Sequence, residues 1–576
     1  MEQYKIYSYL DDITESYNTP ISRVDGLYRN PKEIIRTIEF YTNNQYMSGN
    51  RDGLGREKPF YNVCNYRVTV AKTATDLDVK DIKFEPDSLK FSVQTMLINR
   101  ELYKYLKETN FSLTLNEMGI TRPKYGGVLL KKNKVDGKLD IGVVDWTNLD
   151  FDPSDVIGGA LVETFYFQPS ELASKTEWYD KDEFLKAHNK MYKNKPVKCE
   201  IKEVSGEFPE EFDPEWSGKK TETGKYQRMC FYIGVVGKKK FLLYYEEEKE
   251  SRYKYLPWEA VGKVLGRGVV EDGFESQVWQ NDAMISMKNA MELSGKVVMA
   301  TDSQKISGNA ITGIDNGHIF QMEQGRSLTS VNLSASSLPE FQNIITLWDM
   351  QYNKVSSTYD ANTGEAPTAG TPYSQTALLN QVANSPFEYR REEWGIFLNE
   401  VLNEWIMPEL KKRIKKEHYL VSEFDDEELD LIDETIANFE SNKVVFDKMR
   451  GDGISQMEQM DMITGMKNQL KKTGKKREVK IPEGFLDVEG HITANITGEL
   501  KNKSAVLQSL DSIFKTVVST FNPNTGQYAA LQDPILAKVF AQIVEMSGVP
   551  FSSGQLRGGQ KSPIQQPDLS AIKPLA

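Results

Sequence analysis

Cysteine and histidine are scarce in this sequence of 576 residues. The cysteines lie far apart without CxxC spacing, and no histidine has an HExxH or HxH neighbour. This spacing predicts neither a disulfide framework nor a zinc site. We expect no metal and no cofactor, and we interpret the cysteines as buried free thiols; they are Cys64, Cys199 and Cys230.

Long apolar runs are also missing. Hydrophobic residues make up 39% of the sequence, and the mean hydropathy is −0.52. No stretch approaches the roughly 20 apolar residues that a membrane-spanning helix needs. The first residues, MEQYKIYSYLDDITES, contain neither the basic nor the apolar segment of a secretory signal peptide. We therefore expect no membrane contact, and a protein that stays in the cytoplasm where it is made or leaves by lysis.

The short motifs of nucleotide-binding proteins and hydrolases are absent. The sequence has no GxxxxGKS or GxxxxGKT phosphate loop, no GxGxxG and no GxSxG. Asp150 and Asp152, in NLDFDPSD, form the tidiest pair of acids, and we interpret them as a strand end that turns at Pro153. Because acidic residues are plentiful, a nuclease that uses paired carboxylates stays open as an alternative.

Positive charge is in deficit, with 71 Lys and Arg against 83 Asp and Glu and a net charge of −12. Proteins that grip nucleic acid are usually basic, because Lys and Arg neutralise phosphates. The chain therefore either ignores nucleic acid or handles it without holding it tightly. One basic run, KNQLKKTGKKREVK at 467–480, has the composition to contact phosphate, but we interpret it as a solvated turn.

The N-terminal part of the chain, to about residue 115, is predicted to be helical. Apolar residues at near-helical spacing follow Asn30-Pro31, which is a plausible helix start. Residues 62–79 carry one apolar face with spacings of three and four, although a strand over 66–70 is an alternative. Residues 88–118 form a further amphipathic stretch.

From about residue 120 to 265 the pattern favours strands. Two apolar runs flank Asp136-Gly137, residues 196–204 alternate in polarity, and residues 226–247 read as a second hairpin. A helical insertion is expected near 169–193. Together with the helical segments on either side, this block predicts an α+β fold that is mainly helical.

The stretch 271–420 combines two helices of similar length with a very long one. Helices are predicted over 275–295 and 336–360, with a glycine-punctuated segment of short strands between them and a polar loop at 361–373. Residues 374–418 predict a long helix, with kinks at its two prolines and one apolar stripe. The prolines are Pro386 and Pro408, and the stripe is Trp394, Phe397, Leu398, Val401, Leu402 and Trp405.

The remaining C-terminal part is mixed. A strand or hairpin is expected at 488–500, and helices at 503–521 and 534–547. The segment 551–576 is poor in aromatic residues and is expected to be disordered.

The two shorter helices of 271–420 do not look like core helices of a monomer. Between residues 271 and 375 there are twelve acidic and five basic side chains. Both helices are rich in Asn, Gln, Ser and Met, and neither carries a wide apolar face. Such helices suit contacts between subunits on one side and a wet surface on the other.

At this point the chain resembles a known family, the portal proteins of tailed double-stranded-DNA phages. GRGVVEDGFESQVWQNDAMISMKNAMELSG is similar to the entry into a portal's first stem helix, with Gln277 and Asn281 in a Q-x-x-x-N step. SSLPEFQNIITLWDMQYNKVSSTYD resembles the second stem helix, and TGEAPTAGTPYSQTALLNQ the tunnel loop that runs into a long kinked helix. YGGVLLKK and VVDWTNLDFDPSD are similar to the wing sheet. In its local residue patterns the chain is most similar to portals of short-tailed, crAss-like phages.

The resemblance covers about residues 30–550 and implies a division of the chain into the domains of a portal. These are the wing (1–270, with its β-rich part at 120–265), the first stem helix (271–296), the clip (297–333), the second stem helix (334–360), the tunnel loop (361–373), the long kinked helix with the rest of the wing (374–500), the crown helices (501–550) and a disordered tail (551–576).

The resemblance also implies a function. Portal subunits form a ring, usually of twelve, at one capsid vertex, and double-stranded DNA passes through its channel during packaging, retention and ejection. The ring is not an enzyme and binds DNA without sequence specificity. Its implied partners are other copies of the chain, the major capsid protein, the terminase large subunit, and later head-to-tail adaptor and tail proteins. The implied location is the virion, and the host cytoplasm during assembly.

Residue roles follow from the same resemblance. The candidates for the channel and tunnel loop are Lys288, Lys354, Asp360, Asn362, Thr363, Glu365 and Thr368. The clip candidates for docking terminase and adaptors are Gln304, Lys305, Asn309, Asp315, Asn316 and His318, and those for stem-helix subunit contacts are Gln277 and Asn281. An acidic lining would repel phosphate, while sparse lysines would form rings that centre the DNA.

Two alternatives come from other classes of protein. A metal-dependent nuclease predicts divalent-metal binding and turnover of DNA, although the sequence has no compact constellation of acids and histidine. Another virion structural protein, such as a scaffold or tail adaptor, predicts an oligomer without a DNA channel.

Overall fold

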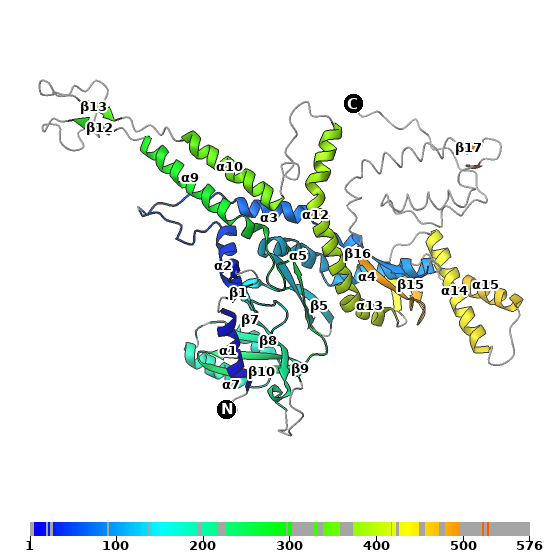
Figure 1. Ribbon diagram of the computed structural model, residues 1–576. Helices are drawn as coiled ribbons and strands as arrows, with labels where there is room; N and C mark the ends of the chain where they lie inside the picture. The colour runs from blue at the N-terminus through cyan, green and yellow to red at the C-terminus, as the bar shows by residue number, and fades with distance from the viewer. Residues whose placement is uncertain are drawn as a thin grey trace. The chain divides into compact units, whose positions relative to one another are not determined.

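The computed structural model describes residues 5–494 except 19–20, 24–26, 54, 89–90, 136–137, 194, 196, 216–225, 295–297, 302–327, 332–337, 358–372, 416–417, 422–425, 449–455 and 472–477, together with 521–522 and 527–528. The chain divides into two compact units, Met1–Asn495 and Ile496–Ala576. Among the described residues helices predominate and the paired strands are antiparallel, so the fold is α+β, as predicted (Figure 1).

The N-terminal segment is helical, as predicted. Its helices are α1 (Lys5–Asn18), α2 (Pro31–Thr42), α3 (Val63–Ala74), α4 (Ser92–Glu108) and α5 (Phe111–Tyr125). The side chain of Asn30 accepts from the amide of Glu33 and caps α2, with Pro31 in the first turn. The helix expected over 62–79 is confirmed as α3, and the strand alternative is wrong. The stretch 88–118 is two helices, because Asn110 between them takes a left-handed φ of 52°.

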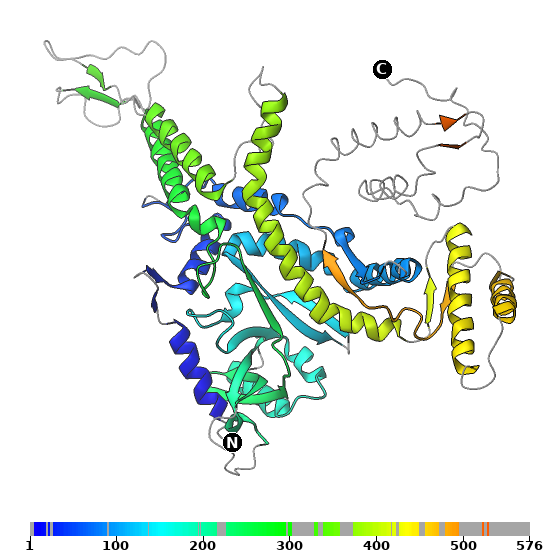
Figure 2. The same ribbon diagram turned by 45° about the vertical axis from the view of Figure 1, so that its right-hand side comes forward.

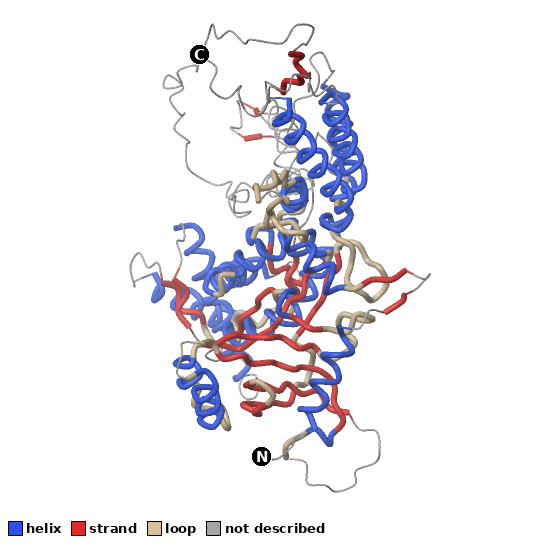
Figure 3. Tube along the Cα trace, turned by 90° about the vertical axis from the view of Figure 1, so that its left-hand side faces the viewer, coloured by secondary structure: helices blue, strands red, loops and turns tan. Residues whose placement is uncertain are grey.

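Two antiparallel sheets form the β-rich block. The larger has the order β10 (Lys239–Glu247), β9 (Tyr226–Val236), β8 (Cys199–Pro209), β7 (Leu161–Phe167) and β6 (Leu149–Asp150). The smaller has the order β11 (Tyr253–Pro257), β4 (Gly127–Val135) and β5 (Lys138–Val143). Both predicted hairpins are confirmed, with Val135 opposite Lys138 and Val236 opposite Lys239. Figure 3 shows these strands in red, with helices around them.

Helices cover both faces of the five-stranded sheet. Ile6, Leu10 and Ile13 of α1 pack on one face against Val204 and Phe231. On the other face, α6 (Pro169–Ser174) and α7 (Lys181–Tyr192) place Leu172 and Phe184 against Cys199 and Ile201. The insertion expected near 169–193 is two helices. In the segment 196–204, Cys199 and Ile201 lie on the face of β8 that α6 and α7 cover, and Val204 lies on the face that α1 covers, so both faces of this strand are buried.

The long helix of the sequence analysis is α12 (Tyr373–Val401), a π-helical turn (Leu402–Ile406) and α13 (Met407–Ile414). Pro386 lies inside α12, and the π turn ends at Ile406, two residues before Pro408. Proline has no amide to donate to the preceding turn, and π turns are a common cause of bends in helices. All six residues of the predicted apolar stripe are buried, so that prediction is confirmed.

A two-stranded ladder ties the end of the first unit to this long helix. β16 (Gly490–Ala494) pairs with β3 (Ile82–Pro86), some 400 residues earlier. Asn403 binds both backbone groups of Ile492, and Asn399 accepts from Ala494. On the other edge, Asn99 of α4 binds both backbone groups of Phe84. Asparagine amides thus replace neighbouring strands on both edges. A strand is confirmed within the stretch 488–500, at Gly490–Ala494, while residues 495–500 lie outside the described part of the chain.

Several further elements complete the described chain. They are the 3₁₀ turns Val79–Asp81, Trp146–Asn148 and Glu210–Phe212, the helices α8 (Val269–Asp272), α9 (Phe274–Ser294), α10 (Leu338–Ser356), α14 (Asp426–Lys448) and α15 (Gln456–Lys471), and the strands β1 (Ile21–Arg23), β2 (Leu27–Arg29), β12 (Val298–Thr301), β13 (Leu328–Val331), β14 (His418–Val421), β15 (Glu478–Ile481), β17 (Phe521–Asn522) and β18 (Gln527–Tyr528). None of the described helices combines the length and apolarity needed to cross a membrane. The helices expected at 503–521 and 534–547, and the tail 551–576, lie outside the described residues except for Phe521, which belongs to β17.

Candidate functional site: the α9–α10 hairpin

Helices α9 and α10 lie side by side as a hairpin, and the views of Figures 1 and 2 agree on this. Both predicted helices are confirmed. Beyond their ends β12 and β13 form a short antiparallel ladder, with Val298 opposite Val331. The hairpin contains Gln277, Asn281, Lys288 and Lys354, which the sequence analysis predicted as site residues. Its contacts show which of these side chains already have partners within the chain.

The base of α9 is fixed by side-chain amides. Gln277 is fully buried, and its Oε1 accepts from the amides of Val63 (2.9 Å) and Cys64 (3.1 Å). Its amide group donates to the carbonyl of Tyr61, and Asn281 Oδ1 accepts from the amide of Tyr61 at 2.9 Å. The first amides of a helix have no partner within the helix. Gln277 therefore caps α3. The role of Gln277 and Asn281 in contacts between subunits stays a prediction.

Replacing Gln277 with leucine is expected to destabilise the chain. The change leaves the buried amide of Cys64 without its acceptor, and it leaves the amide of Val63 and the carbonyl of Tyr61 with only their mutual hydrogen bond of 3.1 Å. We expect the unfolding free energy to fall by about 2–3 kcal/mol in urea titrations. Gln342→Leu, at an exposed position of α10, is the control and should change it by less than about 0.5 kcal/mol. Equal effects of the two changes would contradict the capping role.

The base of α10 is fixed by Tyr352. Its ring is buried, its hydroxyl donates to the carbonyl of Val269 at 2.9 Å, and the guanidinium of Arg67 lies 5.7 Å from the ring centre. Arg67 Nη2 also lies 2.7 Å from Asp349 Oδ1. A Cβ on Gly273 would meet Cζ of Tyr352 at 2.0 Å, so glycine is required there. The base of the hairpin is therefore tightly packed against α3 and α8.

The seam between α9 and α10 is polar and small. Ser276, Gln280 and Ala283 are buried on α9. Neither amide atom of Gln280 has a hydrogen-bond partner in the described part of the chain. An unsatisfied buried amide costs free energy.

One side of the hairpin is apolar and uncovered. Trp279 of α9, which is 50% exposed, stacks on Trp348 of α10 with ring centres 5.9 Å apart. Ile344, Leu347 and Val355 continue this stripe along α10, and Leu347 and Val355 are more than half exposed. Residues three and four apart are neighbours on a helix. Sequence reasoning missed this stripe, although positions 344, 347, 348 and 355 already showed a second apolar row on α10.

The two lysines predicted for the channel differ in their surroundings. Lys288 Nζ donates to the carbonyl of Glu57 at 2.9 Å and lies 3.9 Å from Glu292 Oε1, while Arg56 also pairs with Glu292. Lys288 is thus used to hold the loop 43–62 on α9. Lys354 is exposed and has no ion pair among the described residues.

The other predicted residues do not fall within the described part of the chain. The tunnel-loop candidates Asp360, Asn362, Thr363, Glu365 and Thr368 lie in 358–372, and the clip candidates Gln304, Lys305, Asn309, Asp315, Asn316 and His318 lie in 302–327. Their predicted roles stay predictions.

A buried charged cluster joins the two sheets. Lys131 Nζ of β4 lies 2.7 Å from Glu163 and 2.6 Å from Glu203, which face each other across β7 and β8. Arg252 pairs with Glu203, Glu246 and Glu248. Burial raises the pKa of Glu163 and of Glu248, whereas the nearby Lys131 lowers that of Glu163 and Arg252 lowers that of Glu248. The signal in the sequence is a set of charged residues at inward positions of strands.

This cluster includes the one group of possible metal ligands found among the described residues, Cys230, Glu246 and Glu248. The guanidinium of Arg252 already neutralises both of those carboxylates. Burial also raises the pKa of the Cys230 thiol, and it raises that of Cys64 to about 12. Neutral thiols are weak ligands and nucleophiles. All three cysteines are free and buried, as predicted.

The remaining candidates for chemistry are modest. Asp150 pairs with Lys32, and Asp152 accepts from the amide of Ser154 at 2.6 Å, so the acids of NLDFDPSD end a strand and shape a turn.

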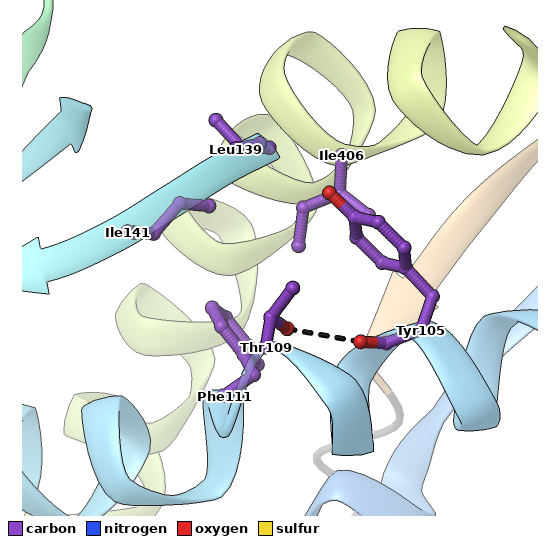
Figure 4. Close-up of a pocket in the computed structure, with 6 residues that line it drawn as sticks. All are labelled: Tyr105, Thr109, Phe111, Leu139, Ile141 and Ile406. Atoms are coloured by element: carbon purple, nitrogen blue, oxygen red, sulfur yellow. Dashed lines mark hydrogen bonds between the residues drawn. The ribbon is translucent and has the colours of Figure 1, made fainter. Parts of the chain in front are cut away.

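A pocket lined by uncharged side chains lies between α4, α5, β5 and the π turn (Figure 4). Burial raises the pKa of its Tyr105 to about 12, and Thr109 donates to the carbonyl of Tyr105 at 3.0 Å. Its lining residues are Tyr105, Thr109, Phe111, Leu139, Ile141 and Ile406.

Comparison with known proteins adds no assignment to this geometry. Neither a protein-family model nor a curated protein matches the sequence.

Proposed function

We propose that the chain is a portal protein of a tailed double-stranded-DNA phage. In this proposal, copies of the chain form a ring, of about twelve by the family's usual number, at one vertex of the capsid. The observation that carries the proposal is the α9–α10 hairpin, whose base is firmly packed while an apolar stripe that includes the exposed Trp279 stays uncovered. Apolar patches of this kind mark interaction sites on soluble proteins.

The order of the elements supports the same proposal. A sheet-bearing block precedes the hairpin, a short ladder lies beyond its ends, and a long bent helix follows it. This is the order of wing, stem, clip and long helix that the resemblance implies. The finer statement that the chain has a portal fold belongs to the proposal.

The charge of the hairpin fits a channel through which DNA slides. Between residues 271 and 375 there are twelve acidic and five basic side chains, and Glu340 is exposed on α10. Each phosphate that a protein neutralises adds to a salt-dependent grip on DNA. Acidic side chains, repeated by the symmetry of a ring, would keep the duplex mobile.

The proposal includes the partners and the location. The ring would sit among major capsid proteins in the virion, bind the terminase large subunit during packaging in the host cytoplasm, and bind adaptor and tail proteins afterwards. It would have no catalytic residues of its own. The nuclease alternative gains no support from the charged cluster between the sheets, because Lys131 and Arg252 already neutralise its carboxylates.

Imaging of the purified full-length chain tests the proposal. We expect rings with a central hole in negative stain, and a native mass near twelve times the 65.6 kDa of the chain. Closed oligomers without a hole would favour another virion structural protein. A monomer that cleaves DNA with magnesium would overturn the proposal and favour the nuclease.

A further inference from the structure

Two sides of the hairpin carry opposite charge. The outer ridge of α10 consists of Leu347, Met350, Gln351 and Lys354, all exposed. The open face of α9 consists of Glu275, Trp279, Asp282 and Ser286, also exposed. Each of these sets follows spacings of three and four and so forms one row on its helix. One row ends in a lysine and the other carries two acids, and each presents a large apolar side chain.

The tryptophan stack fixes the relative level of the two helices. Trp279 lies at the level of Trp348, and the helices run in opposite directions. Lys354 is six residues beyond Trp348, so its level corresponds to a position about six residues before Trp279. Glu275 is the exposed acid of the open face nearest that level. By the same count, Leu347 lies at the level of Trp279.

We infer that the outer ridge of α10 binds the open face of α9 on a second copy of the chain, with Lys354 paired to Glu275 and Leu347 packed on Trp279 of that copy. The inference rests on the proposed function. A ring needs a heterologous contact, in which different surfaces of each subunit meet. In a ring whose symmetry axis runs parallel to the hairpin, each copy is related to the next by a rotation that does not change the height of any residue along that axis. Residues at the same height on the two rows of neighbouring copies therefore meet.

The surroundings of both charged groups agree with this pairing. Neither Lys354 nor Glu275 has an ion pair in the described part of the chain, and Lys288 is already bound to the loop 43–62. The contact assigns Lys354 to the subunit interface instead of the channel. It also explains why Trp279 is half exposed in a single copy, since Leu347 of the neighbouring copy covers it.

Charge reversal tests the pairing on the full-length chain. Lys354→Glu and Glu275→Lys should each raise the protein concentration needed for assembly by roughly tenfold or more, because like charges then face each other. The double variant, which swaps the charges, should restore assembly to within about threefold of the original. Mass photometry over a dilution series measures this, at low salt where surface charges are least screened. Lys238→Glu, in the exposed β9–β10 turn, is the control and should assemble normally.

A second variant probes the apolar part of the contact. Leu347→Asp changes an exposed side chain, so thermal unfolding should stay as in the original chain while assembly is lost. Normal assembly of all these variants would overturn the inference and leave the proposed function standing. Loss of assembly in both single charge variants without recovery in the double variant would overturn the Lys354–Glu275 pairing. An original chain that stays monomeric at every concentration would overturn the inference, and one that also cleaves DNA with magnesium would overturn the proposed function.

Discussion

Lys131→Met is expected to lower the unfolding free energy of the chain by about 3–5 kcal/mol, the usual cost of removing one partner from a buried ion pair. Lys131 Nζ lies within 2.7 Å of Glu163 and Glu203, and all three side chains are nearly inaccessible. Without the lysine, two carboxylates face each other across β7 and β8. Only Arg252 then remains to neutralise Glu203, which it approaches at 3.4 Å.

The loss should depend on pH in a defined direction. Burial raises the pKa of Glu163 in the folded chain, so the folded state binds a proton more readily than the unfolded state. Stability from this group is then fully present below its unfolded pKa of about 4.3 and is lost as the pH rises through its folded pKa. Lys131 lowers this pKa, so its removal raises the pKa further, and Lys131→Met should be less harmful near pH 5 than at pH 8.

Two further variants separate charge from packing. Adding Glu163→Gln to Lys131→Met removes one of the facing carboxylates and should recover part of the stability at pH 8. Lys134→Met, at an exposed position of the same strand, should change the unfolding free energy by less than about 0.5 kcal/mol. Urea unfolding at the two pH values measures all four chains. A Lys131→Met loss that is the same at both pH values would show that packing, not charge, holds the sheets together.

Local patterns in the sequence were enough to place most elements of the fold. Asn30 with Pro31 marks the start of α2, and the Asp136-Gly137 pattern predicted the hairpin in which Val135 pairs with Lys138, because caps and hairpins depend on residues close in the chain. Apolar spacing of three and four likewise found the buried stripe of the long helix that includes Trp394 and Trp405. These features need no knowledge of the rest of the chain.

Pairings between distant segments were not predictable in the same way. Nothing near Ile492 indicates that it pairs with Phe84, or that Asn403 supplies its other partners. At the candidate site, the Q-x-x-x-N step led to Gln277, but its partners at Tyr61 and Val63 come from a segment more than 200 residues earlier. The sequence therefore located the hairpin correctly, while the use of each side chain depended on the tertiary structure.

Tyr352→Ala is expected to detach α10 from the rest of the chain and to cost about 3–5 kcal/mol of unfolding free energy, as for other large buried aromatic side chains. The ring fills the space that Gly273 leaves open, and its hydroxyl donates to Val269. The seam with α9 offers little compensation, because Gln280 and Ser276 make it polar. Hydrogen exchange should show that the amides of α10 lose protection before those of the sheets.

Tyr352→Phe separates the contribution of the ring from that of the hydroxyl. It keeps the packing on Gly273 and removes one hydrogen bond, so the expected loss is only about 1–2 kcal/mol. Tyr103→Ala, at a half-exposed position of α4, is the control for removing an aromatic side chain. If Tyr352→Ala leaves the protection of α10 unchanged, the hairpin is not rooted at this residue. If protection is lost, subunit contacts along α10 should weaken too, because a stripe on a loosened helix cannot be held at a fixed level against a neighbour.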